Sequence, residues 1–585
     1  MPVRKVYLET FGCQMNELDS ELVAGQLRSM GYEFTAAPET ADVVLYNTCS
    51  VREHAEQKVW SRLGELKLRK VDEPGLVVGV LGCMAERDGT DLIKRMPVVD
   101  ILCGPGELDK LPMLLDNAVR TRESLLSEPP LLGLNGIGIK LVSADQVALQ
   151  GSTSRRSGTL AAAEDTLELL DLSRAISPTD HKGSAYVRIT RGCNKFCTYC
   201  VVPFTRGAEV HRPPDHIVDE CKRLADSGVL EITLLGQTVN HYRFEHGSAV
   251  MVNGLTQPQK GRSYKGGHRR DPFASSQTTT FADLLARIHD EAPGIQRLRF
   301  VTSYPRDFGD DVLEVIRDHP RICRYLHVPA QSGSNRILQM MNRGYTIEEY
   351  LEFLDRARSY LHQPAIGRPL TIAGDIINGF PTETEEDHLA TASLLERAKY
   401  KNCFIFKYSP RPGTVAFDKL PDDVPEDVKR RRNNELLDLQ TRISLETSLT
   451  YVGSTVSVFV EGLSRKEHKR QRPGDPAPRA EKHTHGSVGL TISGKAVNAL
   501  PIGGTPPTPA IVESDDACCT TAVSPVPPPS ATIQLCGRTD GDLIVFFDLP
   551  RRDGLNPDDL VGKIVPVKIT DAMPLSLIGA LQTAS

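Results

Sequence analysis

The sequence predicts an α/β protein with an N-terminal α/β domain, a partial (βα)6 barrel and a C-terminal all-β barrel. Three observations predict this architecture. Strand-like and helical patterns alternate over residues 4–104 and again over 185–408, and strand patterns alone follow residue 454. Alternating strands and helices form parallel sheets, whereas short strands without helices form sandwiches or barrels. A chain of 585 residues also exceeds what one hydrophobic core supports and suggests about three to four domains.

The N-terminal domain is expected over residues 3–119. Its first strand lies at 6–8, and Asn16 is the predicted N-cap of a helix that Gly31 ends. A charged helical stretch separates the following apolar runs, which favours a parallel sheet. These buried strands are expected at 42–46, 76–81 and 98–102.

A linker or loose insertion is expected over 120–178, where Pro129-Pro130 and a Gly-rich stretch at 133–138 interrupt the alternation. The barrel domain follows over 179–447 and contains a polar surface insertion at 243–275. Six βα units favour an open barrel over a closed barrel of eight units. The strand candidates are 186–189, 231–235, 297–301, 325–328, 371–377 and 404–408.

The C-terminal domain is expected over 448–583, after a basic helix that carries the cations of 429–432. Its strands alternate at 454–460, 542–547 and 563–569. Residues 464–533 are rich in Pro, Gly, Ser and Thr. Such a composition cannot bury a core, so this insertion is expected to be disordered.

Composition excludes several classes of protein. The N-terminus lacks the apolar stretch of a signal peptide, and no segment approaches the roughly 20 apolar residues of a membrane span. We therefore expect a cytoplasmic protein. The net charge of −6 does not indicate a nucleic-acid binder, although a local basic face is compatible with one. Thirteen cysteines in such a chain indicate metal or redox chemistry rather than disulfides.

A first cysteine triad, Cys193, Cys197 and Cys200, forms a C-x3-C-x2-C loop after the first barrel strand. Three thiolates this close in sequence can bind three irons of a cubane cluster and leave the fourth iron open. An open iron can chelate S-adenosylmethionine and deliver one electron into its sulfonium, which yields a 5′-deoxyadenosyl radical. The loop lies where barrel enzymes build their active sites. The alternative is a structural zinc site, which needs a fourth ligand such as Cys221 or His211.

A second triad is formed by Cys13, Cys49 and Cys83, which follow the first three strands of the N-terminal domain. Residues just past the carboxyl ends of parallel strands gather at one edge of the sheet, so these thiols are expected to meet. Three ligands again indicate a cluster with an open iron, and three buried structural thiols are the alternative. Cys103 also follows a strand and is either a fourth ligand or a spectator. Other cysteines are expected to be core or inert residues: Cys221, Cys323, Cys403, Cys518 and Cys519.

Several stretches resemble the methylthiotransferase family of radical S-adenosylmethionine enzymes, and most closely its tRNA-modifying branch. The N-terminal stretches are TFGCQMN (10–16), DSE (19–21), NTCSVR (47–52) and GCMA (82–85). The later ones are VVPFTRG (201–207), LGQ (235–237), HVPAQSGS (327–334), DIINGFP (375–381) and YSPRPGT (408–414). The branch assignment depends mainly on residues 14–16 and 201–207. The sequence departs from the family at Asn378, where a small apolar residue is frequent, and at Tyr304, where His is common.

The resemblance implies an N-terminal methylthiotransferase domain, a radical S-adenosylmethionine barrel and a C-terminal RNA-binding TRAM domain. It implies methylthiolation of carbon 2 of N(6)-isopentenyladenosine at position 37 of tRNA, with S-adenosylmethionine as radical source and methyl donor. It also implies two 4Fe–4S clusters, an auxiliary one on Cys13, Cys49 and Cys83 and a radical one on Cys193, Cys197 and Cys200.

Three further residues are candidate contacts with the cofactor or the substrate. Tyr199 lies in the radical loop, and Gln237 and Gln331 lie in loops after barrel strands, where hydrogen bonding within the barrel rim is the alternative role. The run at 429–432 could contact tRNA phosphates or form a solvated helix face. Besides tRNA, we expect a small reducing protein of the flavodoxin or ferredoxin type as partner, no membrane, and a monomer.

Two other functions stay open at this point. One is the same chemistry on an aspartate of a ribosomal protein. The other is a zinc-bearing RNA-binding protein without catalytic activity.

Overall fold

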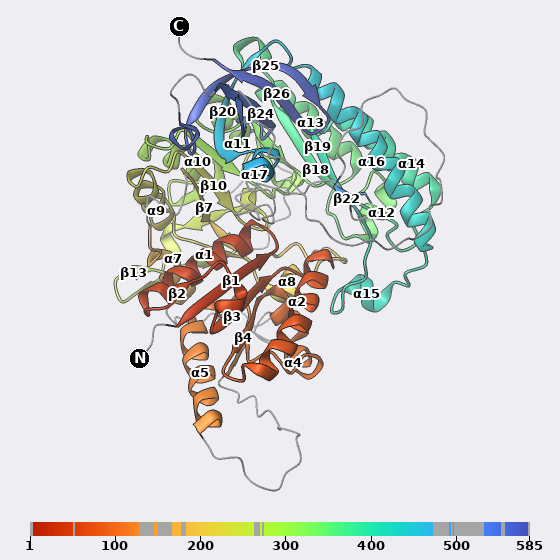
Figure 1. The fold of residues 1–585 in the computed structure, drawn as a ribbon. Coiled ribbons are helices and arrows are strands. Elements are labelled where there is room, and N and C mark those ends of the chain that lie inside the picture. The colour runs from red at the N-terminus through yellow and green to blue at the C-terminus, as the bar shows by residue number, and fades with distance from the viewer. Residues whose placement is uncertain are drawn as a thin grey trace, which may run out of the picture.

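The chain folds into an N-terminal domain, a central barrel and a C-terminal barrel, which Figure 1 colours in red and orange, yellow to cyan, and blue. The predicted α/β class with a C-terminal β-barrel is confirmed. The computed structural model describes residues 4–50, 53–127, 146–149, 166–176, 183–261, 269–271, 274–471, 491–492, 495–496, 532–550 and 556–582.

The N-terminal domain is built on a parallel sheet in the order β2-β1-β3-β4-β5-β6. Side chains of its central strands alternate between two apolar clusters, one against α1 and α5 and the other against α2 and α4. Strands covered on both faces are continuous apolar runs, which explains the sequence pattern. The strands are β1 Lys5–Phe11, β2 Glu33–Phe34, β3 Val43–Thr48, β4 Val77–Gly82, β5 Ile101–Cys103 and β6 Val147–Ala148. The helices are α1 Gln14–Ser29, α2 Glu53–Asp72, α3 Cys83–Asp88, α4 Thr90–Arg95 and α5 Leu111–Ser127.

Helix α1 begins earlier than the sequence suggests. Cys13 is its N-cap, and Asn16 lies in the first turn, so the prediction that Asn16 caps the helix is wrong. The Asn16 side chain is instead fully buried and donates from Nδ2 to Oδ1 of Asn47 at 3.0 Å. Gly31 follows the end of the helix with φ +87°, as predicted for a residue that stops it.

The central barrel consists of two parallel three-stranded sheets, β7-β10-β16 and β17-β18-β19. They are joined where Leu298 of β16 bridges Ile322, and the Cys323 N–H donates to the Leu298 carbonyl at 2.9 Å. Within the described residues β7 and β19 do not pair, so the predicted open six-stranded barrel is confirmed. The strands are β7 Ser184–Arg188, β10 Glu231–Leu235, β16 Arg297–Phe300, β17 Tyr325–His327, β18 Thr371–Asn378 and β19 Asn402–Lys407.

Helices and short strands surround this sheet. The helices are α7 Thr166–Leu172, α8 Val202–Thr205, α9 Pro214–Asp226, α10 Phe281–Glu291, α11 Asp310–Asp318, α12 Asn335–Met340, α13 Ile347–Leu361, α14 Glu385–Ala398, α15 Val415–Lys419 and α16 Glu426–Leu449. The short strands are β8 Thr190–Arg191, β9 Val210–His211, β11 Arg243–Glu245, β12 Met251–Val252, β13 Leu255–Thr256, β14 Gln259–Lys260 and β15 Thr278–Thr280. Four of them, β11 to β14, lie in the insertion expected at 243–275.

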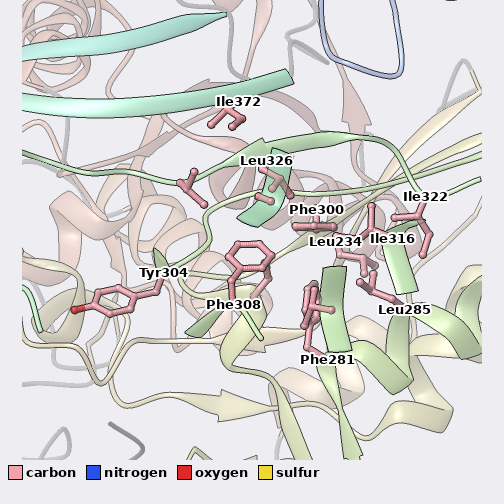
Figure 2. Close-up of a cluster of buried hydrophobic side chains, with 14 of the residues drawn as sticks. Leu234, Phe281, Leu285, Phe300, Tyr304, Phe308, Ile316, Ile322, Leu326 and Ile372 are labelled. Carbon is pink, nitrogen blue, oxygen red and sulfur yellow. The ribbon is translucent and has the colours of Figure 1, made fainter. Parts of the chain in front are cut away.

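Figure 2 shows the barrel core, where apolar side chains of the strands meet those of the helices. The rings of Phe281 in α10 and Phe300 in β16 contact each other edge to face, with centroids 5.2 Å apart. A buried ring of this size contributes about 1.5–3 kcal/mol through the apolar area it removes from water. Tyr304 lies at the border of the cluster with its hydroxyl pointing away, where it accepts the N–H of Gly344 at 2.9 Å.

The C-terminal domain is a closed barrel in the order β20-β23-β24-β26-β25. Its strands are β20 Thr455–Leu463, β23 Thr532–Arg538, β24 Ile544–Pro550, β25 Ile564–Met573 and β26 Ser576–Leu581. Helix α17, Arg465–Gln471, lies inside the range expected to be disordered, so that expectation fails at its start. Most of the remaining range lies outside the described residues, as do Cys518, Cys519 and the Pro- and Gly-rich stretches at 129–138. The strands β21 Thr491–Ile492 and β22 Lys495–Ala496 pair within it.

The turn between β23 and β24 closes the amino end of the central barrel. Arg299 donates to the carbonyl oxygen of Asp540 at 2.8 Å, and Lys401 forms an ion pair of 2.6 Å with Asp542. The Thr371 hydroxyl, at the start of β18, donates to the Gly541 carbonyl at 2.7 Å. Barrel enzymes use the carboxyl ends of their strands for chemistry. The C-terminal domain therefore occupies the opposite end and leaves that face to the N-terminal domain.

None of the described helices has the length and apolar character needed to cross a membrane.

Candidate functional site

The N-terminal cysteine triad lies at one edge of the parallel sheet. Cys13, Cys49 and Cys83 follow β1, β3 and β4, which are neighbours in the sheet. A Cβ placed on Gly12 would lie 3.0 Å from the Cβ of Cys49. Burial raises the pKa of the Cys83 thiol, and the nearby Cys13 contributes to this rise. The structure therefore brings the three thiols together, as the strand topology predicts.

A buried network of amide groups lies directly behind this triad. The Asn47 Nδ2 donates to the backbone carbonyl of Asn16 and to the Ser20 hydroxyl, both at 2.9 Å, and the Cys13 thiol donates to Asn16 Oδ1 at 3.3 Å. Gly82 has φ +86°, and a Cβ there would lie 2.4 Å from Asn47 Oδ1. Only a residue without a side chain fits this position, so the backbone that leads into Cys83 is set by the network.

The radical loop is held by backbone contacts on both sides. Gly192, with φ +68°, approaches residue 208 so closely that a Cβ would lie 2.0 Å from its carbonyl oxygen. The Cys193 N–H donates to the carbonyl of Gly207 at 3.2 Å, and the Cys200 N–H donates to that of Cys197 at 3.0 Å. Thr198 donates from its hydroxyl to the Met340 carbonyl at 2.8 Å. The three cysteines are therefore fixed at one site by contacts with residues 207–208, which follow α8, and with α12.

Two cations and one ring support the same loop. Arg343 donates to the Cys197 sulfur at 3.5 Å, and its guanidinium lies 4.6 Å from the centroid of the Tyr304 ring. The Lys195 ammonium lies 4.6 Å from the same centroid and pairs with Asp307 at 2.6 Å. Cations over an aromatic face are attracted by its quadrupole. Tyr304, where the family often has His, thus holds positive charge next to the thiols.

Both triads have the donors that an iron–sulfur cluster needs. None of the described cysteines forms a disulfide. Burial raises the pKa of Cys193, and burial together with Cys197 raises the pKa of Cys200 to about 12. Thiols in such a setting lose their protons to a bound metal rather than to water. Three closely placed thiols, with one further corner open, fit a 4Fe–4S cluster at each place.

The two triads are joined by a short helical contact. Helix α8 begins two residues after Cys200 and packs against α3, which begins at Cys83. A hydrogen bond with Thr205 of α8 lowers the pKa of Cys83 against the larger effect of burial, and Cys83 in turn raises the pKa of Cys200. The two triads are therefore close enough to sense each other's charge.

A buried acid ties the two domains together beside this contact. Asp19 of α1 pairs with Arg188 of β7 at 3.0 Å and with Arg206 at 2.8 Å. The side chains of Asp19 and Arg188 are 1% exposed, so this pairing is desolvated. A second bridge joins Glu56 of α2 to Arg411, which follows β19, at 3.1 Å. These ion pairs fix the N-terminal triad relative to the radical loop.

Tyr199 lies in the radical loop, and Gln237 and Gln331 lie after β10 and β17, as expected from the sequence. The Tyr199 ring is half-buried against the apolar cluster that contains Met341, and burial with the nearby Cys197 raises its pKa. Gln237 is half-buried two residues after β10. Gln331 has φ +76° and pairs its backbone with β18, where its N–H donates to the Asp375 carbonyl at 2.8 Å. Their contacts with cofactor or substrate stay predictions.

Two described cysteines outside the triads have contacts of their own. The Cys103 thiol is buried at the end of β5 and donates to the carbonyl of Glu107 at 3.1 Å, an arrangement that suits a spectator. Cys221 is buried in α9 within the barrel core and does not join the radical loop. His211, the other candidate for a fourth zinc ligand, lies beside Glu209 and His241 instead.

The basic run of α16 is largely paired within the chain. Lys429 and Arg432 are buried and pair with Asp422 and Glu383. Arg431 is exposed but forms an ion pair of 2.8 Å with Glu385. These three cations support the helix rather than present free charge for tRNA phosphates.

Sequence reasoning identified all six triad cysteines but missed the charged residues that arrange them. Asp19 and Arg206 lie in stretches that resemble the methylthiotransferase family, but no sequence pattern indicated a role for Arg188 or Arg343. The contacts that join the two domains or reach a thiol span more than a hundred residues: 169 from Asp19 to Arg188, 187 from Asp19 to Arg206 and 146 from Arg343 to Cys197. No periodicity or spacing predicts such contacts.

Comparisons with known proteins agree with this geometry. Residues 5–104 match a family described as "Uncharacterized protein family UPF0004", and residues 187–395 match the radical SAM superfamily. The chain is 42% identical over 466 residues to the tRNA-2-methylthio-N(6)-dimethylallyladenosine synthase of Rhodopirellula baltica, covering 80% of this chain and 85% of that one. It is 39% identical over 466 residues to the protein of the same name from Bacteroides thetaiotaomicron, covering 79% and 86%. Among solved structures, the radical S-adenosylmethionine methyltransferase TsrM from Kitasatospora setae has a TM-score of 0.41 and 15% identity, covering 71% of this chain and 77% of that one.

Proposed function

Because the chain belongs to the tRNA-2-methylthio-N(6)-dimethylallyladenosine synthase family of radical S-adenosylmethionine enzymes, we propose that it methylthiolates carbon 2 of N(6)-isopentenyladenosine at position 37 of tRNA. The observation that carries the proposal is the pair of three-thiol sites, one in each of two domains, held together across α3 and α8. A C–H bond of an adenine ring is too strong for acid–base chemistry. Replacing that hydrogen by sulfur therefore needs both a radical source and a sulfur source, which two separate sites can supply.

We propose that Cys193, Cys197 and Cys200 hold the radical 4Fe–4S cluster and that Cys13, Cys49 and Cys83 hold the auxiliary one. When bound, these clusters supply one-electron reduction of S-adenosylmethionine and the sulfur that joins carbon 2.

The chain's own residues prepare the site. Arg343 places positive charge beside the radical loop, where it lowers the pKa of Cys200 against the larger effect of burial. Cys193 and Cys197 are each 9% exposed, so water is largely excluded from the thiols themselves. Tyr199, Gln237 and Gln331 lie in loops at the carboxyl ends of barrel strands, and we assign them to contacts with S-adenosylmethionine or the adenine.

The proposed partners follow from the reaction. The C-terminal barrel is the proposed tRNA-binding domain, which is an argument from fold rather than from a site. The paired cations of α16 do not add to it. A one-electron reduction needs a donor, for which we propose a small flavodoxin- or ferredoxin-type protein.

The decisive experiment is nucleoside mass analysis of tRNA from a strain that lacks its own enzyme of this kind. Expression of this chain is expected to restore 2-methylthio-N(6)-isopentenyladenosine, and the Cys13→Ala variant is expected to restore none. Accumulation of unmodified isopentenyladenosine despite full expression of the wild-type chain would refute the assignment.

The two other candidate functions give different results in matched assays. Methylthiolation of a ribosomal protein aspartate, with tRNA unchanged, would replace the tRNA assignment. A preparation with zinc in the cysteine sites and no labile sulfide after anaerobic reconstitution would indicate a non-catalytic RNA-binding protein.

A further inference from the structure

We propose that Glu209, His211 and His241 form a mononuclear site for one zinc ion, separate from both cysteine triads. The three residues come from the segment around β9 and from η4, Val239–His241, which follows β10. One potential ligand atom of each lies within 4.8 Å of those of the other two. Two imidazoles and one carboxylate are a ligand set that zinc uses in proteins.

The site is buried and nearly assembled. Glu209 is 1% exposed, His211 2% and His241 9%. A carboxylate oxygen of Glu209 already lies 2.5 Å from Nδ1 of His241. Zinc bonds of about 2.0–2.2 Å place tetrahedral ligand atoms roughly 3.4 Å apart. The side chains therefore need only small adjustments to surround an ion.

Two features indicate that a group is missing from this place. Nδ1 of His211 is buried without a hydrogen-bond partner among the described residues, an arrangement that native proteins rarely tolerate. Because Gly261 has no side chain, a small space remains between it and the side chains of Glu209 and His211. A Cβ there would lie 2.6 Å from Oε2 of Glu209 and 3.0 Å from Nε2 of His211. The carboxylate and Nε2 of His211 thus face the same small volume, and the unpartnered Nδ1 is the other nitrogen of the same ring.

The surroundings orient the ligands in the way that metal sites require. The Thr238 hydroxyl donates to the other oxygen of Glu209 at 2.8 Å, which fixes the carboxylate plane. The carboxylate is therefore held in place from two sides, by this hydroxyl and by Nδ1 of His241 at 2.5 Å.

The location gives the ion a role in positioning the radical loop. Asn194, next to Cys193, donates to the Gly261 carbonyl at 3.2 Å and accepts the Glu209 N–H at 3.0 Å. The Gly261 N–H donates to the Glu209 carbonyl at 2.9 Å. An ion bound here would therefore link the loop after β10 to the β9–β14 strand pair. Through Glu209 and Gly261, it would also help to position Asn194, which follows Cys193.

The test uses the full chain after anaerobic cluster reconstitution, followed by exposure to zinc and desalting. Elemental analysis is expected to give about one zinc per chain in the wild type and none in the double variant His211→Asn, His241→Asn. Iron and labile sulfide are expected to be equal in both. Zinc absorption spectroscopy is expected to show nitrogen and oxygen ligands without sulfur.

Two variants make the result specific. His216→Asn removes a histidine from another carboxylate pair, with Glu168 at 3.1 Å, and is expected to keep its zinc. Gly261→Ala keeps all three ligands but fills their space, and is expected to weaken zinc binding at least about tenfold, or 1.4 kcal/mol. If the double variant fails to fold, Gly261→Ala still decides. Wild-type zinc content in both the double histidine variant and Gly261→Ala, or zinc with sulfur ligands in the wild type, would overturn the proposal.

Discussion

The two cysteine triads reach similar chemistry by opposite routes. Cys193, Cys197 and Cys200 lie within one loop, whose shape is set by local turns and by anchors such as Met340. The N-terminal thiols are spread from Cys13 to Cys83 and meet because three neighbouring strands end at the same edge. The arrangement of the first triad therefore depends on the conformation of one loop, whereas that of the N-terminal triad depends on the fold of a whole domain. Damage to the N-terminal fold is expected to affect the second site first.

The largest effect is expected for Cys193→Ala, which removes the radical source and leaves the N-terminal triad intact. Cys193→Ala is expected to lose about four irons per chain and all cleavage of S-adenosylmethionine, because the radical cluster needs three thiolates. Methylthio transfer then stops as well. Iron analysis and 5′-deoxyadenosine quantification check this. Continued 5′-deoxyadenosine formation would place the radical cluster elsewhere.

Cys13→Ala is expected to give a narrower loss. It too should lose about four irons, but reductive cleavage of S-adenosylmethionine should continue while methylthio transfer to tRNA disappears. Measuring both products in one reaction tests the division of roles. Cys103→Ala serves as the control and is expected to keep all iron, because its thiol points to the Glu107 carbonyl. Loss of an entire cluster in that control would make Cys103 a ligand.

Asp19→Asn tests the connection between the two sites. It leaves the buried guanidinium of Arg206 without the Asp19 carboxylate, whereas Arg188 keeps its pair with Asp171 at 2.7 Å. Removing one partner from a buried ion pair costs about 3–5 kcal/mol, which chemical denaturation would detect. Asp91→Asn removes an acid whose pair with Lys94 is fully exposed and is expected to leave the transition unchanged. Equal stability of wild type and Asp19→Asn would show that the domains are held by other contacts.

Gly82→Ala gives the smallest effect and acts on the N-terminal site alone. Its positive φ and the clash with Asn47 should lower stability by roughly 2–4 kcal/mol through backbone strain and overpacking. Occupancy of the auxiliary cluster should fall while that of the radical cluster stays. Gly31→Ala is the matched control, because it has φ +87° and nothing within 4 Å of its Cβ. Similar iron loss in both variants would assign the effect to strain alone.

The sequence predicted what depends on local pattern. All six barrel strands were placed within two residues at each end, since buried parallel strands are short apolar runs between helices. Both triads were identified because cysteine is a metal-binding residue type. Three cysteines share one loop, and the other three each follow a predicted strand. Asn16 was assigned to the wrong role, since its burial depends on Asn47 from a different strand. Asp19, Arg188 and Arg343 could not be predicted, because each acts through partners that only the assembled domains bring near.

The turn that closes the amino end of the barrel also sets an order of events during synthesis. The last barrel helix ends at Leu449, whereas Asp542, the partner of buried Lys401, leaves the ribosome 93 residues later (542 − 449). At about 5–20 residues per second this delay is roughly 5–20 s. Throughout that interval the nascent barrel carries Lys401 without its counter-ion and Arg299 without the carbonyl of Asp540. The amino end of the barrel can therefore stay hydrated and conformationally mobile during this interval. It becomes fixed only when the C-terminal domain has been translated and packs against it.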